Sequence, residues 1–295
     1  MPASLLMVLA TFLFATMGVC VKLASTRYGT AEIVFYRGLI GAVFILVLAR
    51  ARGVGLRTAV PAMHAWRSVV GVSSLMLWFF AIGGLPLATA MTLNYMSSVW
   101  MALFLIGGAV LMGRGGIDGR LLGTVLAGFV GVALVLQPTL ERDQLLHGVV
   151  GLVSGMLSAL AYLQVTALGR AGEPELRIVF YFSLGGMLAG LLGMLATGAH
   201  GHSVEGALLL LAVGLTATTA QVLMTRAYAI GRPLINASLQ YLGIVFSFVW
   251  GLVLFGDAAT PSAAAGMALI VGAGLAATRL RQRAAPATRD PTADS

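Results

Sequence analysis

Uncharged amides and aromatic rings are the side chains best suited to chemistry in this sequence, and they occur inside long apolar stretches. The amides are Asn94, Gln221 and Gln240, each with hydrogen-bond donors and acceptors. The aromatic candidates are Trp78, Tyr95, Trp100, Tyr162 and Tyr241. In lipid, an amide needs a polar partner or a wet cavity. This set predicts that a small molecule is bound by hydrogen bonds and stacking, with helix packing as the alternative for the amides.

Glu32 and Arg37 are the charged residues closest to the interior of an apolar stretch. They are five residues apart, so they can pair loosely across a little more than one helical turn, or each can meet a partner elsewhere. Ionisable residues inside membranes mark ion and substrate paths. Arg37 lies deeper. We interpret the two as a gate or proton-coupling element, with a pair of interfacial or snorkelling side chains as the alternative.

The sequence contains no recognisable metal or enzyme site. Its four histidines, His64, His147, His200 and His202, fall at helix ends or in loops, and the one cysteine, Cys20, lies in an apolar run. No Cys/His cluster has zinc-ligand spacing. A glycine-rich phosphate loop with a lysine is also missing. We therefore expect neither catalytic residues nor a cofactor.

The composition is that of an integral membrane protein. Of the 295 residues, 59% are hydrophobic and only 9% are charged, too few to solvate the surface of a soluble protein of this length. The net charge of +8 comes from arginines in short clusters between apolar runs. That is typical of cytoplasmic loops, whereas a nucleic-acid-binding surface would place them along one face. We expect a lipid bilayer as partner and no nucleic acid.

Apolar runs of about 20 residues predict the membrane-spanning helices. The longest uncharged run, 68–113, divides at the turn signal Gly83-Gly84-Leu85-Pro86. The prediction is an all-α protein with ten transmembrane helices, at 4–24, 32–50, 66–83, 86–112, 120–137, 148–168, 177–197, 206–228, 233–255 and 261–279. Residues 281–295, rich in Ala, Pro, Thr and Asp, are predicted to be a disordered cytoplasmic tail.

The distribution of basic residues predicts the orientation. With a cytoplasmic N-terminus, 14 of the 18 basic residues fall on the cytoplasmic side, Arg67 among them, and Lys22, Arg27, Arg37 and Arg142 on the other. This bias places both termini in the cytoplasm. We expect a multi-pass protein of the inner, or plasma, membrane.

The two halves of the chain repeat one another. Ile33-Val34-Phe35-Tyr36 matches Ile178-Val179-Phe180-Tyr181, and Thr92-Leu93-Asn94-Tyr95 matches Ser238-Leu239-Gln240-Tyr241. Ala81-Ile82-Gly83 likewise matches Ala229-Ile230-Gly231. The predicted repeats are 4–137 and 148–280. Five helices per repeat is an odd number, so the second copy enters the membrane from the opposite side. Inverted repeats are typical of secondary transporters.

These features resemble the drug/metabolite transporter superfamily, in particular its ten-helix EamA type. The resemblance covers about residues 4–280 and rests on the two five-helix units, the stretch 32–38 with Arg37, and the elbow 81–94 that is repeated at 229–240. It implies export of amino acids, other metabolites or drugs, and a central cavity surrounded by helices three, four, eight and nine with parts of one and six. Phe14 and Ala15 stand where many relatives have Trp-Gly.

The sequence therefore predicts a secondary transporter with alternating access, most simply an exporter. The expected substrate is a small neutral, zwitterionic or aromatic metabolite, because Arg37 is the one basic residue expected at mid-membrane. A nutrient uptake permease of the same fold is the main alternative. A membrane-embedded enzyme or a sensor is a more distant one. Proton coupling, and the choice between monomer and homodimer, stay open.

Overall fold

The computed structural model describes residues 1–97, 99–101, 103–104, 107, 119–136, 142–230, 239–257 and 260–284, and the described part is helical throughout its regular elements. The helices of the first half are α1 (Ala3–Ala24), α2 (Thr30–Ala51), α3 (Pro61–Gly84), α4 (Leu87–Tyr95) and α6 (Gly119–Leu136). Those of the second half are α7 (Arg142–Arg170), α8 (Glu175–Thr197), α9 (Val204–Ile230), α11 (Leu242–Trp250), its π-helical continuation η2 (Gly251–Phe255) and α12 (Pro261–Ala284).

Six of these helices are long and apolar enough to cross a membrane. They are the spans 3–24, 30–51, 61–84, 144–170, 175–197 and 204–227, with mean hydropathies between 1.5 and 2.3. A multi-pass membrane protein is thereby confirmed. Each of the ten predicted spans has a helix in the described residues, but α4 ends at Tyr95, and most of the rest of the span predicted for 86–112 lies outside them. Residues 233–238 of the ninth span and 285–295 of the predicted tail also lie outside. The chain is helical to Ala284, four residues into that tail.

Helix ends follow local rules that the span prediction did not use. Helix α3 begins at Pro61, five residues before the predicted start, because proline suits the first helical position, where its missing N–H is not needed. At the other end of the fold, Gly256 has a φ of 62° and closes η2. Glycine adopts this left-handed conformation without steric cost, and the chain then presents Asp257.

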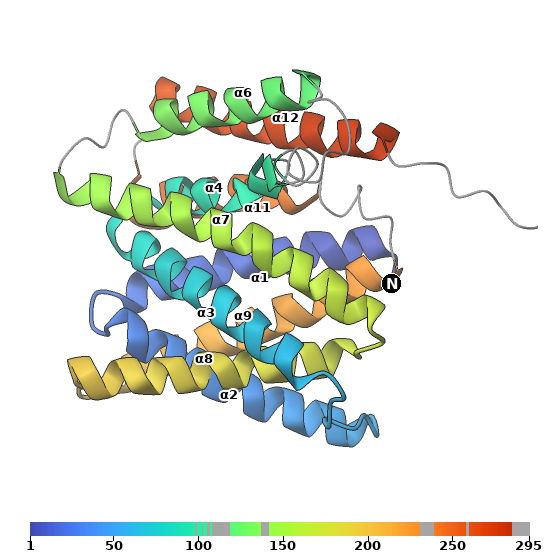
Figure 1. Ribbon diagram of the computed structural model, residues 1–295. Coiled ribbons are helices and arrows are strands. Elements are labelled where there is room, and N and C mark those ends of the chain that lie inside the picture. The colour runs from blue at the N-terminus through green and yellow to red at the C-terminus, as the bar shows by residue number, and fades with distance from the viewer. Residues whose placement is uncertain are drawn as a thin grey trace, which may run out of the picture.

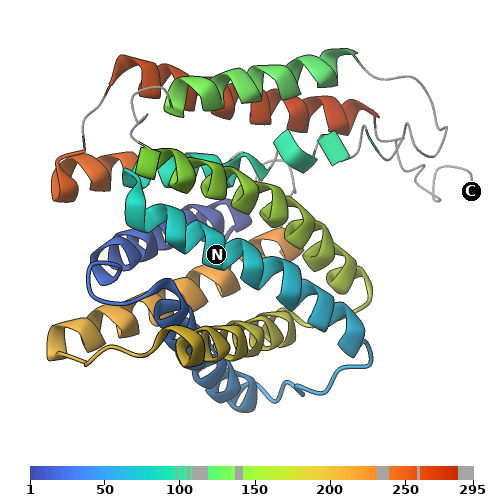
Figure 2. The same cartoon turned by 60° about the vertical axis from the view of Figure 1, so that its left-hand side comes forward.

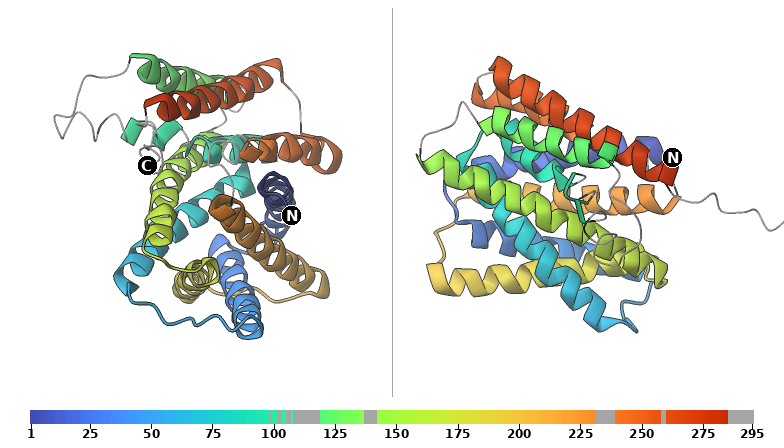
Figure 3. Two further views of the ribbon diagram at one scale, coloured as in Figure 1. Left: turned by 90° about the vertical axis from the view of Figure 1, so that its right-hand side faces the viewer. Right: turned by 45° about the horizontal axis from the view of Figure 1, so that its top comes forward.

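The helices pack mainly in pairs that join one half of the chain to the other. In Figure 1, α6 and α12 lie side by side along one edge, α2 and α8 lie along the opposite edge, and α1 runs between them. Figures 2 and 3 show the same order from other directions. The most extensive pairings are α2 with α8, α1 with α9, α3 with α7 and α6 with α12, and α4 also packs against α11.

Glycines allow α2 and α8 to approach closely. A Cβ atom at Gly38 would overlap the backbone of Met187, and one at Gly190 would overlap the backbone of Phe35. Membrane helices gain little from a hydrophobic effect between them, so small residues that bring backbones together are a main source of association. The contact fixes the level of Arg37, which neighbours Gly38, against α8.

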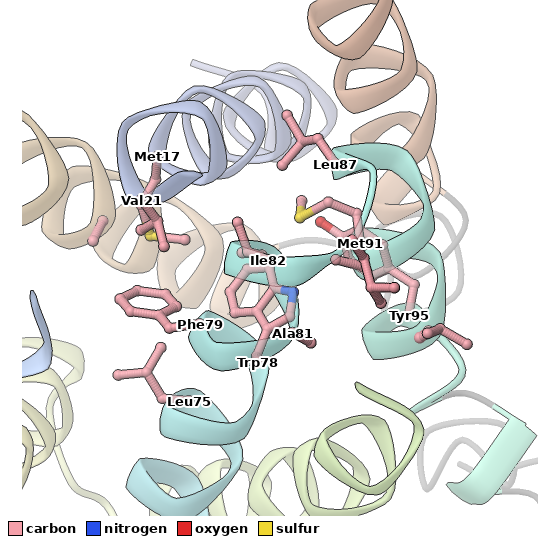
Figure 4. Packing of buried hydrophobic residues seen from close by; sticks show 14 of the residues in the cluster. Met17, Val21, Leu75, Trp78, Phe79, Ala81, Ile82, Leu87, Met91 and Tyr95 are labelled. Atoms are coloured by element: carbon pink, nitrogen blue, oxygen red, sulfur yellow. The ribbon is translucent and has the colours of Figure 1, made fainter. Parts of the chain in front are cut away.

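The core lies between α1, α3 and α4. Figure 4 shows Phe79 and Ile82 of α3 facing Met17 and Val21 of α1, with Tyr95 of α4 farther along. Phe79, Ile82, Met17 and Val21 are almost completely buried. By contrast, large apolar residues on the outer faces of the bundle are exposed, as expected for a surface that contacts lipid. These include Val43, Val69, Leu192 and Leu208.

The α2–α8 contact gives a matched stability test on one helix. We expect Gly190→Ala to destabilise the protein by about 1–3 kcal/mol, because its methyl group would meet the Ala31 carbonyl oxygen as well as the Phe35 backbone. Gly186→Ala should be neutral or stabilising by up to about 1 kcal/mol from helix propensity, since the nearest atom to its new Cβ lies 3.9 Å away. Thermal unfolding in detergent measures both. Equal effects of the two variants would contradict this packing.

Candidate functional site

A cavity lies among the helices, lined from both halves of the chain. The volume of the cavity that is not occupied by protein atoms is about 700 Å³, a figure that includes open solvent at its mouth. Helices α1, α2, α3, α4, α7, α8 and α9 contribute, together with Gln240. The polar or charged lining residues are Thr11, Arg37, Arg67, Ser74, Asn94, Tyr95, Ser158, Tyr162, Gln221 and Gln240. Trp78, Phe14, Phe182 and several methionines supply apolar surface. A concave site with a few convergent polar groups is the usual form of a small-molecule site.

Two buried arginines share one aromatic ring at the cavity wall. The guanidinium carbon of Arg67 lies 4.3 Å from the centroid of the Phe182 ring, and that of Arg37 lies 5.2 Å from it. Arg37 is 5% exposed and Arg67 is 4% exposed. The expectation that Arg37 is the one basic residue at mid-membrane was therefore wrong. Because α3 begins at Pro61, Arg67 lies inside the helix, almost two turns from its first residue.

No counterion accompanies these arginines in the described part of the chain. None of the ion pairs found there includes Arg37 or Arg67. Arg37 Nε, Arg67 Nε and Arg67 Nη1 are buried and have no hydrogen-bond partner. Gly71 makes room for this arrangement, since a Cβ at that position would overlap Arg67 Nη1. Pro61 was the sequence signal that could have revealed the second arginine.

Asn94 is held in a buried polar network that joins α3, α4 and α7. Its Nδ2 donates to Ser154 Oγ at 3.2 Å and to Ser158 Oγ at 3.1 Å. Ser74 Oγ in turn lies 2.7 Å from Ser158 Oγ and donates to the Ser154 carbonyl oxygen. A Cβ at Gly155 would lie 2.5 Å from the Leu93 carbonyl oxygen, so α4 and α7 are in close contact here. Asn94 thus both lines the cavity and ties helices together.

The other predicted binding residues divide into two groups. Trp78, Tyr95, Tyr162, Gln221 and Gln240 line the cavity with Asn94. Gln240 is partly buried and donates to Met224 Sδ at 3.4 Å. Trp78 Nε1 is buried without a hydrogen-bond partner.

Trp100 and Tyr241 are not among the lining residues. Trp100 packs edge-on against Phe129 of α6, with ring centroids 5.1 Å apart. Tyr241 is buried beside Tyr95, with centroids 6.5 Å apart, and so stands behind a lining residue.

Glu32 has partners other than Arg37. Its carboxylate, 1% exposed, lies 2.9 Å from His200 Nδ1 and 3.9 Å from His202 Nε2. His202 also lies 2.8 Å from the Tyr36 hydroxyl and 3.3 Å from that of Tyr28. This cluster joins the start of α2 to the segment between α8 and α9. Of the two arrangements that the sequence left open, the structure has the one in which Glu32 and Arg37 have separate environments.

A second polar contact closes the same end of the bundle. Lys22 Nζ lies 3.5 Å from Asp257 Oδ1 and donates to the Leu85 carbonyl oxygen at 3.0 Å. Asp257 Oδ2 accepts the backbone N–H of Leu87 at 3.1 Å. Lys22 also lies over the ring of Phe255, 4.7 Å from its centroid. The end of α1, the elbow between α3 and α4, and the end of η2 are thereby joined.

The opposite end, where α2 leads into α3, has a buried carboxylate at Glu173. Its oxygens accept hydrogen bonds from Thr58 at 3.0 Å and from Arg177 at 3.2 Å, and lie 2.9 Å from His64 Nε2. Burial by itself raises the pKa of Glu173, but the hydrogen bonds with His64, Thr58 and Arg177 outweigh it and lower the pKa. Its stabilising contribution is present at neutral pH and is lost as the pH falls through the lowered pKa.

Comparison with known proteins assigns the chain to a family. It is 34% identical over 279 residues to the pseudopaline exporter CntI of Pseudomonas aeruginosa, covering 94% of this chain and 96% of that protein. The chain belongs to the same family as this exporter. It is also 27% identical to an uncharacterized transporter of Helicobacter pylori, covering 92% of both chains.

The comparisons support the fold as well as the family. A solved crystal structure of 21% sequence identity superposes with a TM-score of 0.64, covering 95% of this chain and 98% of that one. No protein-family model matches the chain, so the resemblance to the EamA type stays a prediction. The apolar helices and the named relatives together identify a membrane transporter, in agreement with the expected class.

The surroundings of Asn94 and Gln240 predict different costs of removing the two amides. Asn94→Leu removes two hydrogen bonds between buried groups and should destabilise the protein by about 2 kcal/mol. Among the described residues, the bond that Gln240→Leu removes is a weak one to sulfur, and the variant should cost about 0.5 kcal/mol or less. Thermal unfolding in detergent measures both. We expect both variants to lower transport. A larger loss of stability in Gln240→Leu than in Asn94→Leu would contradict these assignments.

Proposed function

We propose that the protein is a secondary transporter that exports a small metabolite from the cytoplasm through the central cavity by alternating access. The supporting observation is a partly polar cavity enclosed by apolar helices of both halves. Buried polar groups in a membrane bundle are expensive, and they recur where a substrate passes. The relative named as an exporter supports the direction. An uptake permease would have the same cavity and is distinguished by the direction of flux.

The pairing of helices supports two inverted repeats. In the repeat, α1 corresponds to α7, α2 to α8, α3 to α9, α4 to α11 and α6 to α12. If corresponding helices are exchanged, the α1–α9 pair becomes α7–α3, and the α1–α11 pair becomes α7–α4. Both members of each exchange are present, and the α2–α8, α4–α11 and α6–α12 pairs convert into themselves. Such two-fold organisation allows the two arrangements of one scaffold to open the cavity on opposite sides.

The two ends of the bundle are held by different contacts, as alternating access requires. The Lys22–Asp257 contact lies at the end opposite to the N-terminus. The cavity reaches toward the N-terminal end through Met7 of α1 and Arg67 of α3. The arginine bias predicts that this end faces the cytoplasm and that the protein lies in the inner membrane. The structure then corresponds to a state closed to the outside. The Glu32 cluster, with two histidines, is where proton coupling would act.

Blocking the cavity should stop transport without unfolding the protein. Ala161 lines the cavity on α7, so Ala161→Phe should reduce export at least tenfold. Val153→Phe, on the same helix but 36% exposed on its outer side, is the matched control and should retain export. The measurement compares metabolites in the medium of cells that express each variant at equal level, with pseudopaline as the first probe. If no metabolite in the medium depends on the wild-type chain, the proposed function is wrong.

The closed side can be tested by cysteine labelling. In a Cys20→Ser background, Thr11→Cys places a thiol in the cavity wall. An impermeant thiol reagent added outside intact cells should label it slowly. Asp257→Ala should accelerate labelling several-fold, because it removes the partner of Lys22 and of the Leu87 N–H.

Glu205→Ala is the control for this experiment. It breaks the exposed Arg27–Glu205 ion pair at the same end of the bundle and should have no effect on labelling. Fast labelling in the otherwise unchanged protein would show instead that the cavity opens to the outside.

A further inference from the structure

The two arginines define a chemical preference that the overall shape of the cavity does not. Arg37 and Arg67 bring two positive charges to one ring, within a cavity whose described lining residues include no aspartate or glutamate. An arginine in hydrocarbon is costly, and two neighbouring ones also repel each other. In the described part of the chain the buried carboxylates Glu32 and Glu173 already have other partners, histidines for Glu32, and His64 and Arg177 for Glu173.

The unpartnered atoms around the cavity all have the same hydrogen-bonding character. Among its described lining residues, the buried side-chain atoms without a partner are Arg37 Nε, Arg67 Nε, Arg67 Nη1 and Trp78 Nε1. Each of them is a donor. A buried donor without an acceptor loses the hydrogen bond that it had in water, and this loss is unfavourable. The site is therefore complementary to a group that offers several acceptor oxygens and negative charge.

We infer that Arg37 and Arg67 together bind an acidic group of the transported metabolite, a carboxylate or a comparable oxyacid. The inference rests on the proposed function and specifies its substrate class. The forked guanidinium matches the two oxygens of a carboxylate. Phe14 and the methionines of the wall face the less polar remainder of the molecule. The expected substrate carries an acid group, and a wholly neutral metabolite lacks the feature that the site requires.

Gly71 is the positioning residue of this site. It lies one helical turn after Arg67, and its missing side chain leaves the space that Arg67 Nη1 occupies. Any larger residue would push the guanidinium aside while both charges stay in the protein. Gly71→Ala therefore separates the position of the charge from its presence.

The decisive experiment compares binding of two probes of equal shape to the purified protein. With the C-terminus amidated in both, the dipeptide Glu-Glu carries two side-chain carboxylates as its acidic groups, and Gln-Gln has neutral amides in their place. We expect Glu-Glu to bind at least about tenfold more tightly, measured by calorimetry. Arg37→Gln and Arg67→Gln should each reduce this preference about tenfold, and Gly71→Ala and Arg37→Lys should reduce it in part. Arg27→Gln, an exposed arginine outside the cavity, is the control and should retain it. Equal binding of the two dipeptides, or no binding of either, would overturn the inference.

Thermal unfolding of the protein without ligand provides a second, independent measurement. If the arginines are kept for binding, removing one buried charge should relieve the repulsion, and the melting temperature of Arg67→Gln should equal or exceed that of the wild type. A fall of several degrees would assign Arg67 to the structure and overturn the inference. Neither measurement uses flux. The inference about acid binding can therefore fail while cavity-dependent export holds, and export can fail while acid binding holds.

Discussion

The constraint on which the interior of this protein depends is the burial of two guanidinium groups that have no ion-pair partner in the described part of the chain. Charged side chains in a membrane bundle must face a partner, water or a ligand. Arg37 and Arg67 come from different helices, and both lie against Phe182 of a third. An aromatic face provides attraction to a cation without neutralising its charge. The helices around these side chains therefore enclose space for a polar molecule where an ordinary bundle would have a solid apolar core.

That space is stable only because the surrounding helices are held closely elsewhere. Gly38 and Gly190 bring α2 and α8 to backbone contact, one residue beyond Arg37 on α2. On the other side, Gly155 does the same for α7 and α4, next to the hydrogen bonds of Asn94. Packing and polar pairing thus fix the walls, and the cavity side chains are left free to differ.

The sequence was sufficient to predict the membrane class and the helices, and most of the binding residues that it proposed line the cavity. Long apolar runs and their few polar interruptions have simple meanings in lipid. The sequence was insufficient at places where a single residue shifts an element or chooses among neighbours. Arg67 was assigned to the cytoplasmic side because the predicted span began at residue 66, one residue before it, whereas Pro61 starts the helix earlier. Trp100 was expected in the cavity from its depth alone, but Phe129 of α6 provides it with an aromatic partner. Depth along a helix does not determine which face a side chain occupies.

The proposed repeat also explains why the site is asymmetric. Arg37 follows directly after the tetrapeptide at 33–36, and Phe182 follows directly after the matching tetrapeptide at 178–181. Equivalent positions of the two repeats thus supply a cation and the aromatic ring on which it rests. Asn94 and Gln240, also equivalent, differ in the same way: Asn94 is fixed by two serines, whereas Gln240 donates to a sulfur in the described part of the chain. A scaffold with two similar halves can reverse its opening, while a site built from dissimilar residues at matching positions can recognise a molecule that has no symmetry of its own.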